Sequence, residues 1–438
     1  MTGRHGGARV TIATDTNKAG VFSADNLCGS MDYIRFLKNN LRWLMAGALL
    51  TLASTFGQTY FIALFGSQIR EAFSLTHGGF GFVYMIATLA SAVTLVWLGQ
   101  LADVMRLKTL GLATIAGLTV AAFSMGFATS WIWLAISLYL LRLFGQGMMS
   151  HVAMTAMARW FNSHRGRALS VASLGHAVGE AILPGLAVVA LLYVGWRETW
   201  LLAAGILALV IAPVFFFLTR KERAIGKVAG DAENSDDGAH WQRRQVLRDW
   251  LFYAMLPGTL ASSFIVTVVF FHQAYLVETK GWSMAVWGGF YPFFAVAATV
   301  VALAVGWAVD RWSARQLLSV YLLPLALAVV IFAYGQNQAA GLAGMIAIGG
   351  SVGAAQTLSS AVWAELYGTA HLGSIKALTA AGGVLASAIG PGLTGYLLDI
   401  GVSLESIFVA MAVYCVVMSA LFLLLQPILM SERKPGSN

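Results

Sequence analysis

The segments GQLADVMRLK (Gly99–Lys108) and GWAVDRWSAR (Gly306–Arg315) share one spacing of glycine, aspartate and basic residues, and they lie 207 residues apart. The same offset relates further pairs: Trp43 and Trp250, Gly166 and Gly373, Gly175 and Gly382, Pro184 and Pro391, Gly185 and Gly392. Matches in one register at so many positions indicate an internal duplication. The chain is therefore built from two similar halves.

The composition places these halves in a membrane. Of 438 residues, 58% are hydrophobic and only 11% are charged, which is typical of polytopic membrane proteins. Windows of roughly 20 apolar residues, the length of one helical span, are expected near 43–65, 80–101, 109–128, 131–157, 168–192, 199–218, 250–275, 287–309, 317–334, 340–362, 376–397 and 406–425. The windows lack the alternation typical of a membrane β-barrel. The predicted fold class is an all-α polytopic membrane protein with twelve transmembrane helices in two pseudo-symmetric six-helix halves.

A charged stretch, residues 220–245, separates the two sets of spans and is expected to be a linker. Because each half has an even number of spans, both halves enter the membrane from the same side, as parallel repeats. We predict an N-terminal tail at 1–42, a first half at 43–218, a linker at 219–249, a second half at 250–425 and a C-terminal tail at 426–438. Residues 1–30 are expected to be disordered, and Met31 is an alternative start of translation.

Lysine and arginine are expected almost entirely in loops on one side of the membrane, and loops rich in these residues stay in the cytoplasm. With both termini cytoplasmic, the outer loops hold only Arg70, Arg197 and Lys280. The expected location is the plasma membrane, most simply a bacterial inner membrane. The net charge of +8 then reflects topology and contact with anionic lipids, and no nucleic-acid partner is expected.

Two six-span halves joined by a basic linker resemble the major facilitator superfamily of secondary transporters. The quoted loops resemble its Gly-x-x-x-Asp-Arg-x-Gly-Arg-Arg signature, although Val104 and Arg106 stand where the first loop would have Arg and Gly. A carboxylate at a helix end can latch one conformation through a neighbouring helix N-terminus or a basic side chain. The alternative is an aspartate that merely ends a helix. The predicted gating residues are Gly99, Asp103, Arg106, Gly306, Asp310, Arg311 and Arg315.

Within the superfamily, ARWFNSHRGRALSVASLGHAVGEAILP (Ala158–Pro184) resembles the monocarboxylate transporter and oxalate/formate antiporter group. The resemblance implies small organic anions as substrates. The basic residues that this group places in spans eight and eleven have no counterpart here, because span eight is uncharged and Lys376 lies at the cytoplasmic mouth of span eleven.

Ionisable residues inside the expected spans are candidates for function. Arg142 lies roughly 16 Å from the outer end of span four, and Glu180 roughly 18 Å from the inner end of span five, so we expect them to pair. Arg142, Gln58, Gln146 and Gln356 are predicted to bind substrate, and Glu180, His176 and His151 to couple protons. The structural alternatives are an Arg142 that only bonds carbonyl groups of neighbouring helices, and histidines, His151 and His272, that are satisfied within the core.

The predicted function is alternating-access transport of a monocarboxylate or related organic anion, coupled to protons, by a monomer. The alternative is a proton-coupled efflux pump for amphiphilic drugs or metabolites. An enzyme is not expected, because His-Glu-x-x-His, Gly-x-Gly-Asp and phosphate-loop motifs are absent from the sequence. Neither a cofactor nor a metal is predicted. A third possibility is a receptor derived from a transporter, but such a receptor would be expected to carry an added soluble domain for signalling.

Overall fold

The computed structural model describes residues 18–161, 164–221 and 241–431, with side chains from Arg35 onward except that of Asp103. Every regular element in these ranges is a helix. Ten of the described helices are long and apolar enough to cross a membrane, and a bent pair at the first span makes eleven. The all-α polytopic class is confirmed, since helices satisfy their own backbone groups where water is missing.

The helices follow the expected spans closely in both halves. In the first half they are α1 Lys18–Ala53, α4 His77–Leu98, α6 Leu107–Gly126, α7 Trp131–Leu140, α8 Ser150–Trp160, α9 Arg165–Val194, α10 Trp196–Ile206 and α11 Ala212–Leu218. In the second half they are α13 Trp250–Phe271, α14 Gln273–Thr279, α15 Met284–Gly288, α16 Tyr291–Trp312, α18 Leu323–Tyr334, α19 Gln338–Tyr367, α20 Leu372–Asp399 and α21 Leu404–Met430. Short connecting helices are α5 Leu101–Val104, α12 Arg243–Val246 and α17 Ala314–Leu317.

Three details differ from the expectations. Helix α1 begins at Lys18, so residues 18–30, which were expected to be disordered, are helical here; once a helix exists, each added residue gains a backbone bond. The end of the expected linker is folded, because Trp241 is buried against the ring of Tyr367. Span nine is shorter than expected: turns precede α18, whose second residue, Pro324, has no N–H and favours a helix start.

The first span is broken rather than straight. Helix α1 ends at Ala53, and the chain continues through η1 Ser54–Gly57, α2 Thr59–Ile62, η2 Ala63–Phe65 and α3 Gly66–Phe73, with a 47° bend at the break. A Cβ on Gly57 would lie only 2.6 Å from the Cα of Gly145 in span four. Two facing glycines therefore let the break sit directly on span four.

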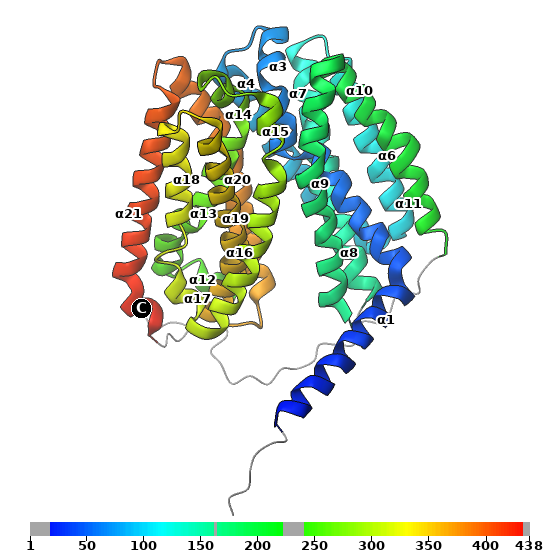
Figure 1. Cartoon of the computed structure of the whole chain (residues 1–438), viewed down its shortest axis with the longest axis vertical. Coiled ribbons are helices and arrows are strands. Elements are labelled where there is room, and N and C mark those ends of the chain that lie inside the picture. Colours follow the sequence, from blue (N-terminus) through cyan, green and yellow to red (C-terminus); the bar gives the residue numbers. More distant parts are fainter. Residues whose placement is uncertain (1–17, 162–163, 222–240, 432–438) are drawn as a thin grey trace, which may run out of the picture.

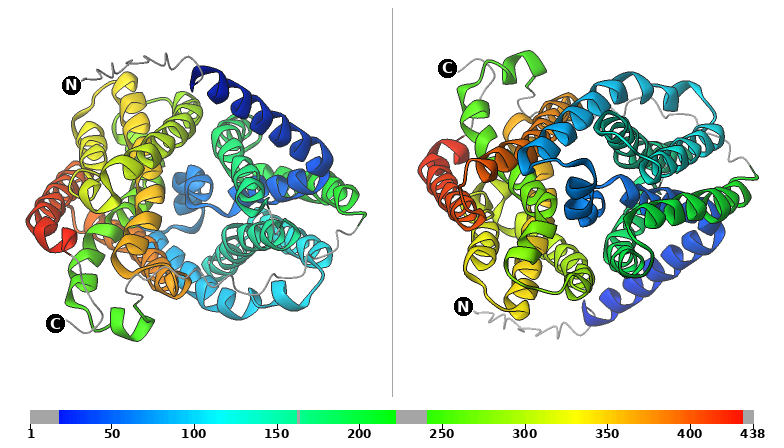
Figure 2. Two further views of the ribbon diagram at one scale, coloured as in Figure 1. Left: turned by 90° about the horizontal axis from the view of Figure 1, so that it is seen from below. Right: turned by 90° about the horizontal axis from the view of Figure 1, so that it is seen from above.

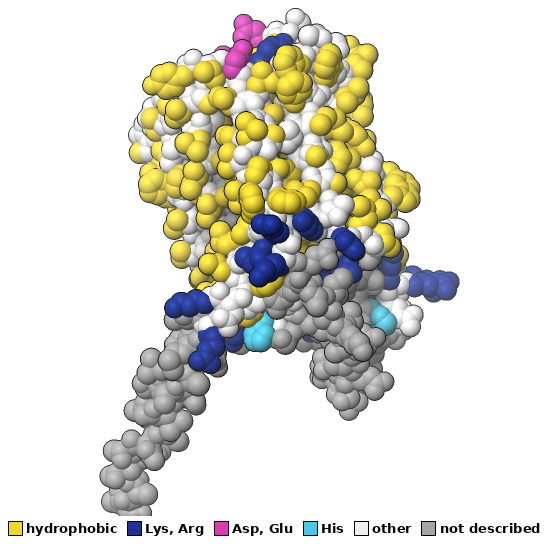
Figure 3. Space-filling view, turned by 90° about the vertical axis from the view of Figure 1, so that its right-hand side faces the viewer, with side chains coloured by type: hydrophobic (Ala, Val, Ile, Leu, Met, Phe, Trp, Pro, Cys, Tyr) yellow, Lys and Arg dark blue, Asp and Glu magenta, His cyan; other side chains and the backbone are white. Residues whose placement is uncertain are grey.

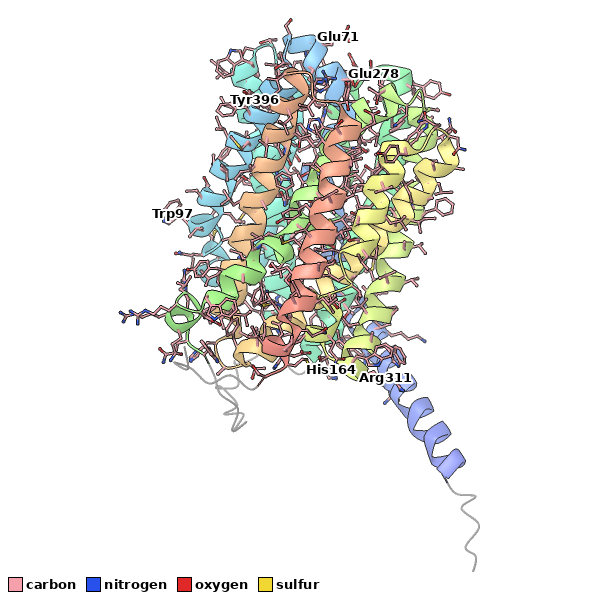
Figure 4. The ribbon with its side chains drawn as sticks, turned by 90° about the vertical axis from the view of Figure 1, so that its left-hand side faces the viewer. Glu71, Trp97, His164, Glu278, Arg311 and Tyr396 are labelled. Atoms are coloured by element: carbon pink, nitrogen blue, oxygen red, sulfur yellow. The ribbon has the colours of Figure 1, made fainter. Side chains whose placement is uncertain are left out.

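The helices form two bundles side by side (Figure 1). Viewed along the long axis, the first half lies on one side and the second half on the other, with the broken part of the first span (blue) between them (Figure 2). Lysine and arginine gather on the surface at one end, which we call the basic end, while the flank is hydrophobic (Figure 3). Arg311 lies at the basic end (Figure 4). Glu71, Glu278 and Tyr396 lie toward the opposite end (Figure 4).

The two bundles touch most closely at the opposite end. Helix α4 packs along α20, α9 along α15 and α16, and α2 against α13. On α9, Leu174, Val178, Ile182 and Leu186 follow each other at helical spacing and are 46–58% exposed, which is the pattern of a face turned to lipid.

Candidate functional site

A cavity of about 580 Å³ lies between the halves, beside the part of α20 nearest the basic end. Helices α13, α19 and α20 supply most of its wall, and Gln146 reaches it from the first half. Its polar lining residues are Gln146, Thr259, Ser262, Ser263, Thr267, Gln356, Ser359, Lys376, Thr379 and Ser387. Such a set of hydroxyl and amide groups suits a small polar solute.

The only full charge among the described lining residues is that of Lys376. Its Nζ donates a hydrogen bond to Ser360 Oγ at 3.1 Å. Two of the predicted substrate-binding residues, Gln146 and Gln356, line the cavity. Gln58 does not line it: the residue is half-buried at the break of the first span, where its backbone is extended.

Arg142 lies in a π-helical segment, η3 Leu141–Met149, and is 2% exposed. Its Nη1 donates to the Gly57 carbonyl at 3.1 Å and to Thr59 Oγ1 at 3.3 Å. The guanidinium stands 5.3 Å from the ring centre of Tyr84, a cation–π contact, and the Tyr84 hydroxyl is 2.5 Å from Thr59 Oγ1. Arg142 thus fastens the broken first span to spans two and four.

The predicted pair of Arg142 and Glu180 is not formed in this structure. No ion pair joins them among the residues that the structure describes, and Arg142 bonds the break instead. The cause is the break itself, because backbone groups at Gly57 leave the regular helical pattern and need other partners. Nε of Arg142 finds no hydrogen-bond partner in the described part of the chain.

Glu180 is half-buried in α9, and the described residues give it no hydrogen bond or ion pair. Because Gly175 and Gly179 have no side chains, the neighbouring face of α9 packs closely against the first span. Five residues after Glu180, a Cβ on Gly185 would lie 3.3 Å from the Gly288 carbonyl oxygen of the second half. Four residues before Glu180, Nδ1 of His176 lies 3.4 Å from Ser54 Oγ. The interior of the protein therefore places a carboxylate without a hydrogen-bond partner near the contact between the halves.

His151 has a different setting from His176. It is exposed, and its Nε2 lies 3.0 Å from the Gly99 carbonyl, to which it donates. Arg159 donates to the Ala102 carbonyl nearby. Both side chains support the loop of the first repeat, where Arg106 is exposed. The side chain of Asp103 lies outside the described residues.

In the second repeat, basic residues bond within their own half. Arg315 Nε is 3.6 Å from Glu365 Oε2, and its Nη1 donates to the Leu429 carbonyl at 2.9 Å. Glu365 also accepts from the backbone N–H groups of Ala314 and Arg315 at 2.8 and 3.2 Å, so it caps α17. Asp310 and Arg311 are exposed. Arg311 lies 6.0 and 5.9 Å from the rings of Trp307 and Trp312, and a Cβ on Gly306 would meet no described atom within 4 Å.

At the opposite end, polar groups join the two halves directly. Gln273 is fully buried; its Nε2 donates to the Tyr60 carbonyl at 2.7 Å, and its Oε1 accepts from Tyr291 and Trp287 at 2.7 and 2.8 Å. His272 beside it is 3% exposed; it bonds the Pro391 backbone, while its Nε2 has no partner among the described residues, so the core histidine considered from sequence is satisfied only in part. Sequence reasoning missed Gln273 and Glu365, and the one available signal was a polar residue within or beside an apolar window.

Residues 47–379 and 293–437 match the Major Facilitator Superfamily. The chain belongs to the Major Facilitator Superfamily. It is therefore a membrane-embedded secondary transporter of a small solute, with no enzymatic activity implied.

Solved structures of the superfamily have the same fold. A bacterial homolog of the human lysosomal transporter Spinster, inward-facing and unoccupied, superposes with a TM-score of 0.66 at 15% identity over 90% of this chain and 98% of that one. The nucleoside transporter NupG gives a TM-score of 0.66 at 12% identity over 87% of this chain and 98% of that one. At these identities the likeness concerns the fold alone.

A curated relative in sequence is the membrane sensor protein UhpC of Escherichia coli (strain K12). It is 26% identical over 205 residues, which are 42% of this chain and 46% of that protein. This match spans less than half of the relative. It supports the superfamily and not specifically the monocarboxylate and oxalate/formate group that the sequence resembles.

Proposed function

We propose that the protein carries a small organic anion, best represented by a monocarboxylate, by alternating access and in symport with protons. The observation that carries this proposal is the polar cavity whose described lining has one full charge, the ammonium of Lys376. The amide groups of Gln146 and Gln356, together with the serine and threonine hydroxyls of the lining, can hold the carboxylate and its substituents. An anion entering this site would exchange water for charge-assisted bonds.

The basic end is the cytoplasmic side in this proposal, since lysine- and arginine-rich loops stay in the cytoplasm. The conformation described above is then the inward-facing one, in a plasma membrane such as the bacterial inner membrane. The loops at Gly99–Arg106 and Gly306–Arg311 would gate the cytoplasmic mouth, because they lie at the end where the cavity is found, whereas Arg315 bonds within its own half. Alternation between the two states only requires that a ligand bias their equilibrium.

Glu180 is the proposed proton site. A half-buried carboxylate with no bonded cation among the described residues is costly when ionised, and Glu180 lies on α9, which packs against α15 and α16 of the second half. His176, one turn away, is the second candidate, and His151 at the basic end is the third. Arg142 would bind the anion only after leaving the break of the first span, so its substrate role belongs to another conformation.

The proposal is tested by uptake of radiolabelled lactate, formate and oxalate into proteoliposomes, with an imposed pH gradient. Lys376→Met should weaken the uptake of a carried anion at least tenfold in affinity, because the cationic contact is lost. Arg244→Met is the matched control, since Arg244 is basic, exposed, outside the cavity lining and outside the two gating loops, and it should leave the affinity unchanged. Equal effects of both variants would contradict the proposed site. Saturable binding without flux would identify a sensor instead of a carrier.

The alternative, proton-coupled efflux of amphiphiles, has one observation in its favour. An apolar groove of about 560 Å³ lies among α13, α20 and α21. Drug-dependent proton release from proteoliposomes, with no uptake of small acids, would favour this alternative.

A further inference from the structure

The apolar groove faces the membrane, and its walls are almost free of polar groups. It is lined by Pro257, Leu260, Ala261, Phe264, Ile265, Ala386, Leu393, Thr394, Leu397, Val402, Ser406, Ile407, Ala410, Met411 and Tyr414. Leu393 is 48% exposed and Tyr414 38%, so the groove is open on its lipid side. The Tyr414 hydroxyl donates to the Pro257 carbonyl at 3.0 Å.

One residue, Leu260, lines both this groove and the polar cavity. It lies on α13 and packs onto α20 at Gly382, where an added Cβ would be 3.2 Å from the Leu260 Cδ1 atom. At the next residue, a Cβ on Gly383 would be 3.3 Å from Ser263 Oγ. The partition between an apolar and a polar space is here a leucine side chain resting on a glycine. In this structure the Leu260 side chain closes the partition, so a chain would pass only after that side chain changes its rotamer.

The cavity has its charge on the same helix as this partition. Lys376 precedes Gly382 by six residues, which is about 9 Å along α20. Gly383, seven residues after Lys376 and on the same helix face, also lines the cavity and adjoins Gly382. A carboxylate held at Lys376 would extend an alkyl chain along this face toward the contact between Leu260 and Gly382. Beyond that contact lie the apolar side chains of the groove.

We propose that the transported anion is an amphiphilic alkyl carboxylate, with its head in the polar cavity and its chain passing between Leu260 and Gly382 into the groove. This inference rests on the proposed function and names the substrate class for the same site. Leu260 forms a wall shared by the groove and by a cavity that contains a cation, and this shared wall favours the substrate's own chain over a bilayer lipid as the occupant of the groove. Each methylene buried there strengthens binding about fourfold.

Chain length is the first measurement. In proteoliposomes, straight-chain carboxylates of three to twelve carbons compete with uptake of a radiolabelled short carboxylate. The wild-type protein should show a steep gain in inhibition with chain length. Leu260→Trp should flatten this gain, measured as the slope of inhibition against carbon number after normalisation to the variant's own inhibition by the shortest acid. Leu303→Trp is the matched control, because Leu303 is a lipid-facing leucine on α16, 73% exposed and outside the groove. Comparison with the Leu303→Trp variant corrects for the greater partitioning of long-chain carboxylates into the bilayer.

A carboxylate with a photoreactive diazirine at its chain end gives the second measurement. It should label groove peptides of α20 and α21 in the wild type and in Leu303→Trp, and at least tenfold less in Leu260→Trp. Leu260→Ala, which widens the passage, should increase the labelling and serves if the tryptophan variant does not fold. Equal slopes and equal labelling in Leu260→Trp and Leu303→Trp would overturn the inference as ordinary lipid contact. Failure of every short carboxylate to compete, by contrast, would overturn the proposed function.

Discussion

Asp399, at the end of α20, accepts hydrogen bonds from the backbone N–H groups of both His77 and Gly78, at 3.0 and 2.9 Å. These residues are the first two of α4, so a carboxylate of the second half caps a helix of the first. The approach requires glycine, because a Cβ on Gly78 would lie 2.6 Å from the Asp399 Oδ2 atom. A carboxylate at a helix N-terminus also meets the favourable end of the helix dipole. Asp399 therefore holds the halves together at the end opposite the basic one.

Replacing Asp399 with alanine should let this end open more often. Loss of a capping side chain costs about 1–2 kcal/mol, which corresponds to roughly a 5- to 30-fold shift in the equilibrium between closed and open states. Spin labels at the exposed residues Glu71 and Thr279, one in each half, should report a larger population of long distances.

The control variant removes a carboxylate that lies at the same end but pairs with a residue of its own half. Glu405 pairs with Lys280 at 3.3 Å, and both belong to the second half. Glu405→Ala should leave the distance distribution as in the wild type. Identical distributions for Asp399→Ala and Glu405→Ala would rule out the capping contact as a latch.

Glu365→Gln should lower stability and leave the exchange between the two states nearly unchanged. The carboxylate caps α17 and pairs with Arg315 inside the second half, and both partners are about one quarter exposed. We expect a loss of about 1 kcal/mol, seen as a thermal unfolding midpoint lower by about 2 °C. A normal midpoint with altered turnover would instead identify Arg315 as part of the gate.

The fold could be predicted because its signals are repeated and local. The internal offset, the apolar windows and the side preference of Arg and Lys each recur along the chain, so they point to one architecture. The break at Gly57 and the short span nine escaped prediction, because apolar composition does not record where a helix stops. Trp241 is a large apolar residue within the expected linker and could have indicated local packing there, but the prediction followed the charged composition of the whole segment.

The site was predictable only in part, for a physical reason. Gln146 and Gln356 could be chosen because a neutral hydrogen-bonding side chain in an apolar span requires a partner. The pairing of Arg142 failed because depth along two helices does not determine the direction of a side chain, and the broken first span offered carbonyl oxygens nearer by. Gln273 and Asp399 act across the halves, and sequence periodicity within one half carries no information about such contacts.

Arg142→Lys should impair both stability and transport although the charge is kept. Lysine lacks the planar donor group that bonds the Gly57 carbonyl and Thr59 Oγ1 while lying over Tyr84. Loss of a charge-assisted bond in a buried setting costs about 1.5–3 kcal/mol, so the unfolding midpoint and the uptake rate should fall together.

Thr59→Val provides the comparison for that variant. It removes the hydroxyl that Arg142 and Tyr84 share and keeps the side-chain volume. We expect a smaller loss of stability with the anion affinity intact. If Arg142→Lys lost anion affinity at an unchanged unfolding midpoint, Arg142 would be a substrate ligand rather than a tie between helices.

Glu180→Gln should separate anion exchange from the use of a pH gradient. The amide imitates the protonated carboxylic acid in size and charge, so counterflow, which requires no net movement of protons, should continue at close to the wild-type rate. Accumulation driven by a pH gradient should disappear, because the side chain can no longer take up and release a proton. Glu278→Gln, at an exposed carboxylate of the opposite end, should leave both activities intact. A Glu180→Gln protein that still concentrates the anion in response to pH would show that the proton travels elsewhere, and His176, close to Ser54 on the same helix, would be the next residue to replace.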